Sequence, residues 1–181
     1  CGATVAVVAH SRMAHAEARA ARIRETGGKA IALQADVLSR VSLQAMADMV
    51  AQRYGRVDML INAAGGARKE ATTGAGQSFF DLPEDAVRFV MDLNFLGTFF
   101  ACQVFSRIMV RQGGGRILNF SSMGALRPLT RSVAYSAGKA AISNFTQWLG
   151  VHLAQEYSAA IRVNALVPGF FLTEQNKFLL I

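Results

Sequence analysis

Short apolar runs alternate with longer segments of helical pattern, and this alternation is the strongest constraint on the fold. The apolar runs are rich in Val, Ile, Leu and Ala and lie at residues 4–9, 30–35, 57–61, 116–120 and 161–167. Runs that are apolar on both faces are typical of parallel strands, because helices cover both faces of such a sheet. Helical patterns occupy the segments between them, among them residues 42–54, 83–112 and 134–157. The alternation predicts an α/β fold with a doubly wound parallel sheet and right-handed crossovers.

Reactive side chains follow the apolar run at residues 116–120. Ser121 and Ser122 come directly after it, and ligands of open α/β sheets bind at the carboxyl ends of strands. Tyr135 and Lys139 are one turn apart on the next predicted helix, so their side chains share a face. An ammonium group stabilises a nearby phenolate, which makes a Tyr and Lys pair a candidate for proton transfer. The alternative is a chance Tyr-x-x-x-Lys spacing with a solvated lysine.

Further residues occur in the same order as in a known family. The chain contains Asn62-Ala63-Ala64-Gly65 after a strand, Asn94 within a helix, then Ser122, Tyr135 and Lys139, and finally Pro168-Gly169 and Thr173. From about Gly2 to its end, the chain resembles the short-chain dehydrogenase/reductase family. The resemblance implies a Rossmann-type fold whose catalytic residues are Asn94, Ser122, Tyr135 and Lys139. In the family the Asn helps to hold a water molecule that links the Lys to solvent.

The resemblance also implies a nicotinamide cofactor. The positions expected to bind it are His10, Ser11, Arg12, Asp36, Val37, Asn62, Ala63, Ala64, Gly65, Tyr135, Lys139, Val167, Pro168, Gly169 and Thr173. An acidic residue at the end of the second family strand would bind the ribose of NAD, but Ala9 stands there. Arg12 follows, which favours NADP(H), with NAD(H) as the alternative. Arg12 can equally begin a solvated helix face, and Asp36 can cap the next helix.

The substrate expectation rests on four runs, at residues 91–97, 121–130, 144–148 and 168–176. These runs are similar to those of the D-mannonate oxidoreductase (fructuronate reductase) branch of the family, which implies a sugar-acid substrate. Arg127, Gln175 and Asn176 are the residues expected to bind this anionic small molecule. The alternatives are a hydrophobic ketone, an acyl thioester, or a non-catalytic binding protein with the same fold.

The length of 181 residues suits one domain, but it is short for the family. Cys1 stands just before what resembles the second family strand, so residues 1–181 are expected to be a single truncated domain, incomplete at both ends. The first strand with its Gly-rich turn would be absent, leaving unpaired edges in the sheet. The resemblance further implies a homo-oligomer, either a dimer or a tetramer.

Composition excludes several other classes. Hydrophobic residues make up 52% of the chain, yet no uninterrupted apolar run approaches the roughly 18 residues of a membrane span, so no membrane association is expected. The formal charge of +7 comes from scattered Lys and Arg residues without a nucleic-acid-binding motif. Cys1 and Cys102 have neither metal-type nor disulfide-type spacing, and His15 and His152 lack ligand-like neighbours. We therefore expect a cytoplasmic protein without a metal site.

Overall fold

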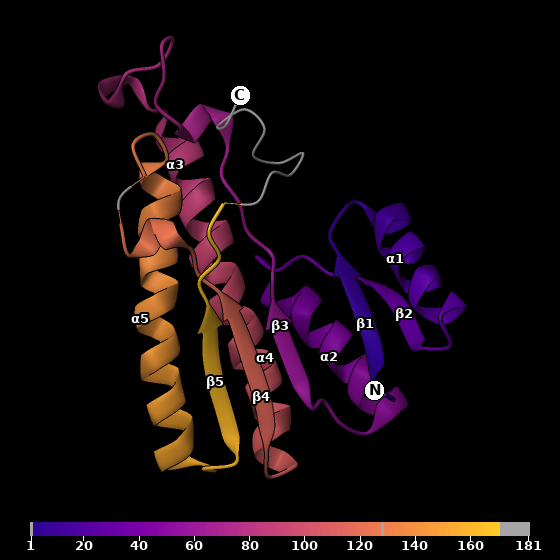
Figure 1. Ribbon diagram of the computed structural model, residues 1–181. Coiled ribbons are helices and arrows are strands. Elements are labelled where there is room, and N and C mark those ends of the chain that lie inside the picture. The colour runs from indigo at the N-terminus through magenta and orange to yellow at the C-terminus, as the bar shows by residue number, and fades with distance from the viewer. Residues whose placement is uncertain (1, 128, 171–181) are drawn as a thin grey trace.

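All strands of the described structure run parallel, in two separate groups. The structure is a computed structural model that describes residues 2–127 and 129–170 (Figure 1). Strand β1 (Thr4–Ala9) pairs with β2 (Lys29–Gln34). Strands β3 (Met59–Asn62), β4 (Gly115–Phe120) and β5 (Ile161–Leu166) form a second sheet in the order β3-β4-β5. The predicted α/β class with parallel strands is confirmed.

Helices connect the strands as the alternation predicts. They are α1 (Met13–Glu25), α2 (Arg40–Tyr54), α3 (Glu84–Met91), α4 (Gly97–Arg111) and α5 (Val133–Glu156), with short 3₁₀ turns η1 (Lys69–Ala71), η2 (Phe79–Asp81) and η4 (Met123–Ala125). Ser39 caps α2 by accepting a hydrogen bond from the Ser42 N–H, and Gly55 ends it in the left-handed conformation with φ 74°. Apart from the segment 83–112, the observed bounds lie within two residues of the predicted ones.

The segment 83–112 differs from the single α-helix that its pattern predicts. A π-helical segment, η3 (Asp92–Leu96), separates α3 from α4, so one turn of the run is wider than an α-helical turn. Pro83 does not lie in the first turn but precedes it, and its carbonyl accepts the first helical bond from Val87 N at 3.1 Å. Such segments are frequent at functional sites, and this one contains Asn94.

Helix α4 lies at the centre of the core and contacts two apolar clusters. One cluster joins α2 and α4, and the other joins α4, α5, β4 and β5. By length and composition alone, the run Glu84–Arg111 would qualify as a membrane span, with half of the apolar window buried. Asp92, Asn94 and Arg107 interrupt this run, so it is not an uninterrupted apolar segment. Its packing against both clusters accounts for its apolar composition.

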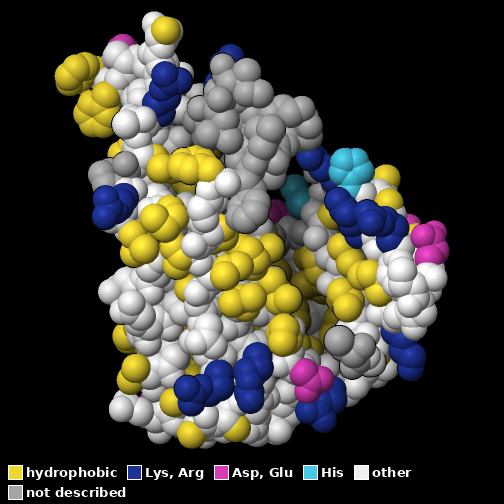
Figure 2. Space-filling model, viewed as in Figure 1, with side chains coloured by type: hydrophobic (Ala, Val, Ile, Leu, Met, Phe, Trp, Pro, Cys, Tyr) yellow, Lys and Arg dark blue, Asp and Glu magenta, His cyan; other side chains and the backbone are white. Residues whose placement is uncertain are grey.

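Apolar side chains are exposed on the strands that flank the division between the two sheets. Val5 and Val8 of β1 are 38% and 41% exposed, and Met59 and Ile61 of β3 are 57% and 53% exposed. Figure 2 shows apolar side chains gathered over the strands on the face turned towards the viewer. Among the described residues, β1 pairs only with β2 and β3 only with β4, so each of these two strands has one unpaired edge.

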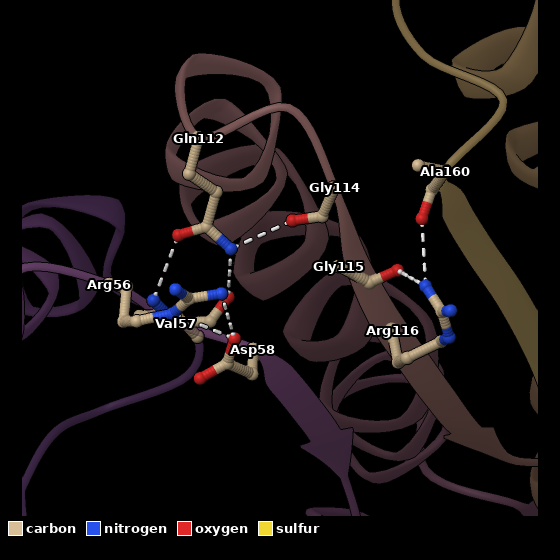
Figure 3. A network of polar contacts seen from close by, with 8 residues as sticks. All are labelled: Arg56, Val57, Asp58, Gln112, Gly114, Gly115, Arg116 and Ala160. Atoms are coloured by element: carbon tan, nitrogen blue, oxygen red, sulfur yellow. Dashed lines mark hydrogen bonds and ion pairs between the residues drawn. The ribbon is translucent and has the colours of Figure 1, made fainter.

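Hydrogen bonds fasten the amino ends of β3 and β4 to the end of α4, and join β4 to the residue before β5 (Figure 3). The Gln112 side-chain amide donates to Val57 O and Gly114 O, each at 2.7 Å, and its oxygen accepts from Val57 N at 3.0 Å. Arg116 donates to Ala160 O at 2.7 Å. These bonds fix one end of the sheet, and the predicted site residues lie at the other.

Candidate active site

Lys139 is buried at the carboxyl end of β4. Its Nζ donates to Phe120 O at 2.7 Å, and the residue is 5% exposed. Burial lowers the pKa of Lys139 to about 8, since the charged form loses solvation. Tyr135 is half-buried one turn earlier on α5, with its ring centroid 5.6 Å from Nζ. The predicted pair therefore comes together, and the alternative of a solvated lysine is wrong.

Ser122 lies two residues beyond the end of β4 and caps η4. It is 9% exposed, and its Oγ accepts a hydrogen bond from Gly124 N at 3.1 Å. A hydroxyl that accepts one bond can still donate its own proton to another oxygen. Ser122 thus has the chemistry needed to orient a substrate oxygen.

Asn94 is fully buried in the π-helical segment, where its amide binds backbone atoms. Its Nδ2 donates to Gly66 O and to Val90 O, each at 2.8 Å, and its Oδ1 accepts from Gly66 N at 3.1 Å. These bonds give the buried amide a structural purpose, because they fasten the loop after β3 to the helical run. The expected role of Asn94 in holding a water molecule stays a prediction.

Gly65 brings the loop after β3 close to both Asn94 and Lys139. Its φ is +152°, and a Cβ there would lie 2.7 Å from Asn94 Oδ1 and 3.3 Å from Lys139 Nζ. Only a glycine fits this position without displacing its neighbours. The predicted loop, Asn94 and Lys139 are therefore parts of one packed site.

Asn119 is a buried site residue that the sequence reasoning missed. It is fully buried in β4; its Oδ1 accepts from Asn62 Nδ2 at 2.9 Å, and its Nδ2 donates to Thr146 Oγ1 at 2.9 Å. Asn62 also donates to the Cys102 sulfur at 3.2 Å. Through its bond to Asn119, Asn62 ties β3 to β4. The sequence signal that could have identified Asn119 is its polar amide within an otherwise largely apolar predicted strand.

The predicted adenosine-side residues follow β1 and β2. His10 O accepts from Gln34 Nε2 at 2.9 Å, and Arg12 is exposed just before α1. Asp36 accepts from Leu38 N at 2.9 Å, but the cap of α2 is Ser39, so the alternative that Asp36 caps this helix is wrong. Val37 packs closely on α4, because a Cβ at Gly97 would lie 2.9 Å from its Cγ2.

The remaining predicted residues are only partly described. Pro168 O accepts from Met123 N at 3.1 Å, so the Val167-Pro168-Gly169 corner lies beside η4. Arg127 is exposed, and its backbone N donates to Met123 O at 2.9 Å. No contact of the Arg127 side chain with Ser122 or Tyr135 is found in the described structure. Thr173, Gln175 and Asn176 lie outside the described residues.

Parallel strands, with these side chains at their carboxyl ends, define a Rossmann-type α/β protein. Residues 1–180 match the short chain dehydrogenase family. The chain belongs to this family.

Similar proteins support the same assignment. The uncharacterised oxidoreductase UxuB of Bacillus subtilis is 46% identical over 167 residues, which is 88% of this chain and 59% of UxuB. A candidate D-mannonate oxidoreductase from Haemophilus influenza, with bound NAD, superposes with a TM-score of 0.88 at 38% identity, covering 98% of this chain and 66% of that one. A gluconate 5-dehydrogenase from Burkholderia cenocepacia, in complex with NADP and tartrate, gives 0.85 at 27% identity, covering 99% and 66%. The chain thus spans about three fifths of the length of the curated relatives it matches.

Proposed function

We propose that the protein interconverts an alcohol and a carbonyl compound with NADP(H) or NAD(H). The observation that carries the proposal is the buried ammonium of Lys139, which lies 5.6 Å from the Tyr135 ring centroid. A scaffold protein has no need of a desolvated lysine next to a tyrosine, whereas proton transfer uses one. The rival interpretation, a non-catalytic binding protein, does not explain that arrangement.

The residues at the strand ends fit a dinucleotide. Ala63 and Ala64 are exposed after β3, and their small side chains leave the backbone accessible to a flat ligand. When bound, the nicotinamide cofactor supplies or accepts the hydride. Tyr135 then gives or takes the proton at its phenol oxygen, and Ser122 donates a hydrogen bond to the substrate oxygen. Lys139 stabilises the phenolate and binds the nicotinamide ribose.

Replacing the phenol tests this assignment. Tyr135→Phe removes only the oxygen that exchanges the proton, so kcat should fall by roughly 10²–10⁴-fold, the usual contribution of a general acid or base. Cofactor affinity, measured by calorimetry, should stay close to that of the wild type. Unchanged turnover in the full-length protein with Tyr135→Phe would contradict the proposal.

We favour NADP(H) over NAD(H) as the cofactor. No acidic side chain stands at the end of β1, and the exposed Arg12 is suited to a ribose phosphate. The relatives are divided, since the Haemophilus protein binds NAD and the Burkholderia protein NADP. Arg12→Ala should lower kcat/KM with NADPH and leave kcat/KM with NADH unchanged. An equal loss with both cofactors would contradict the role of Arg12.

For the substrate we propose a sugar acid such as D-mannonate or D-fructuronate. The exposed guanidinium groups of Arg127 and Arg131 come from the segment between η4 and α5, close in sequence to both Ser122 and Tyr135. Cations of this kind bind carboxylates through charge-assisted hydrogen bonds. The names of the Haemophilus and Burkholderia relatives also indicate sugar acids.

An uncharged ketone or an acyl thioester is the competing substrate class. Met123, Leu126 and Phe170 are apolar and exposed, at 38%, 65% and 62%, and all come from segments that follow β4 or β5. Their side chains would suit an apolar substrate.

Parallel assays separate the two substrate classes. Rates with D-fructuronate and with uncharged ketones of similar size are compared in the wild type and in Arg127→Ala. Arg162→Ala is the matched control, since Arg162 is exposed near the amino end of β5, away from the site. The sugar-acid proposal expects a higher KM for D-fructuronate in Arg127→Ala only. Faster turnover of the uncharged ketones than of D-fructuronate would favour the competing substrate class.

We also propose a cytoplasmic homo-oligomer. Val133, Trp148 and Val151 of α5 are exposed, at 46%, 55% and 57%, and offer an apolar surface to a second copy. Light scattering should give a mass of at least two chains, and a monomer would contradict this proposal.

A further inference from the structure

Polar side chains connect β4 with α5 where an apolar helix–sheet contact would be usual. Asn119 Nδ2 donates to Thr146 Oγ1 at 2.9 Å, and Ser121 Oγ lies 2.6 Å from Ser143 Oγ. Ser121 Oγ also donates to Lys139 O at 3.0 Å. We call the four residues Asn119, Ser121, Ser143 and Thr146 the polar seam. Three of them are almost fully buried, with Asn119 at 0%, Ser121 at 3% and Thr146 at 5% exposure.

The seam follows the periodicity of both elements. Asn119 and Ser121 are two residues apart, so they point to the same face of the β4 strand and its extension. Ser143 and Thr146 lie four and seven residues after Lys139, on the stripe of α5 that contains it. Two groups of β4 thus meet two groups of α5, directly beside the site.

The Thr146 hydroxyl is also bound to its own helix, and the Ser143 hydroxyl, which can donate either to Ser121 or to Lys139 O, lies close to a carbonyl of that helix. Thr146 Oγ1 donates to Ile142 O at 2.8 Å, and Ser143 Oγ lies 3.2 Å from Lys139 O. Because an amide nitrogen can only donate, the Asn119 bond to Thr146 has one direction, and the Thr146 proton is committed to its helix. The helix backbone itself is therefore tied to the strand.

Hydrogen bonds of this kind resist sliding, whereas apolar contacts do not. Apolar burial has no preferred direction, but a hydrogen bond weakens steeply beyond its narrow range of distance and angle. A shift of α5 by one residue is about 1.5 Å along its axis and would break the seam. The same shift would move Lys139 Nζ away from Phe120 O, its acceptor at 2.7 Å.

We propose that the polar seam fixes the position of α5 along its axis relative to β4, and that its members are positioning residues for Tyr135 and Lys139. This inference rests on the proposed function for its kinetic consequences. The competing explanation is that the seam only satisfies buried polar groups, in which case its loss lowers stability without a specific effect at Lys139.

Thr146→Val is the sharpest test, because it keeps the shape of the side chain and removes the hydroxyl. In the full-length protein, kcat should fall by about 10- to 100-fold, as expected for displacement of catalytic groups by about 1 Å, and the KM for cofactor should rise, because Lys139 also binds the nicotinamide ribose. Thr146→Ser keeps the hydroxyl and should restore kcat. Ser106→Ala is the control, since Ser106 is a buried hydroxyl of α4 outside the seam.

A second readout does not depend on turnover. The polypeptide is labelled with [13Cε]lysine, and the NMR signal of Lys139 is assigned with Lys139→Arg. The signal should move in Thr146→Val and return in Thr146→Ser. An unmoved signal, or a loss of kcat equal to that of Ser106→Ala, would overturn the proposal. A wild type without activity on any carbonyl would overturn the proposed function instead, and the Lys139 signal would still decide the role of the seam.

Discussion

Adding one methyl group at Gly65 should destabilise the fold, through a contact deep in the site. The backbone there has φ +152°, a region that side chains rarely occupy. The new Cβ of Gly65→Ala would lie 2.7 Å from Asn94 Oδ1 and 3.3 Å from Lys139 Nζ. Both distances are shorter than an ordinary van der Waals contact of about 3.5–4.0 Å between carbon atoms.

The size of the effect follows from two contributions. Holding a non-glycine residue in such a conformation costs about 1–3 kcal/mol. Asn94 cannot move aside freely, because its amide is held by bonds to Gly66 and Val90, and forcing a side chain off its rotamer adds about 0.5–1.5 kcal/mol. The sum is about 1.5–4.5 kcal/mol, which for a domain of this size lowers Tm by roughly 3–18 °C.

Thermal unfolding followed by circular dichroism measures this shift. Gly74→Ala is the control, since a Cβ at Gly74 meets no atom within 4 Å and its φ lies outside the left-handed region. The control should unfold at the temperature of the wild type or slightly above it, because alanine restricts the unfolded chain. If Gly65→Ala unfolds at the same temperature as Gly74→Ala, the close packing of Gly65 against Asn94 and Lys139 is refuted.

Three further predictions concern buried polar groups. Between about pH 8 and 10.5 the unfolded chain binds a proton at Lys139 that the folded chain has released, so the stability of the wild type relative to Lys139→Met should rise with pH in that window, as measured by urea titration. Burial raises the pKa of Cys102 to about 12, so in a Cys1→Ser background Ellman's reagent should detect a thiol only after denaturation. Asn119→Ala leaves one N–H of Asn62 without its acceptor on β4, while the Cys102 sulfur still accepts from Asn62, and should lower the free energy of unfolding in urea by about 1–3 kcal/mol; an unchanged stability would contradict the structural role of this bond.

The periodic features of the fold were predictable from sequence, because they depend on neighbours along the chain. The bounds of β1 and α5 follow from apolar runs and from the absence of helix breakers, which are local properties. The pairing of Tyr135 with Lys139 also needs only the helical repeat. Local periodicity therefore fixed the elements and placed one pair of reactive side chains.

The rest depends on partners that are distant in the sequence. Asn119 binds Asn62, 57 residues earlier, and Thr146, 27 residues later, so its role appears only when the strands are assembled. The wide turn at Asp92–Leu96 is equally hidden, because its residues also fit an ordinary helix pattern. Asn94 was recognised as an anomaly, but its bonds to the backbone of Gly66 could not be read from the sequence.

The π-helical turn has a consequence for how the run Glu84–Arg111 tolerates mutation. One extra residue in a helix rotates everything beyond it by about 100°, since an α-helix has 3.6 residues per turn. The wide turn absorbs one such residue, so α3 can face α5 while α4 faces the two clusters. Deleting one residue within 92–96 should therefore convert the wide turn into an ordinary one and leave both helices in phase. The residues of the turn itself would shift, and Asn94 would lose its bonds to the backbone of Gly66.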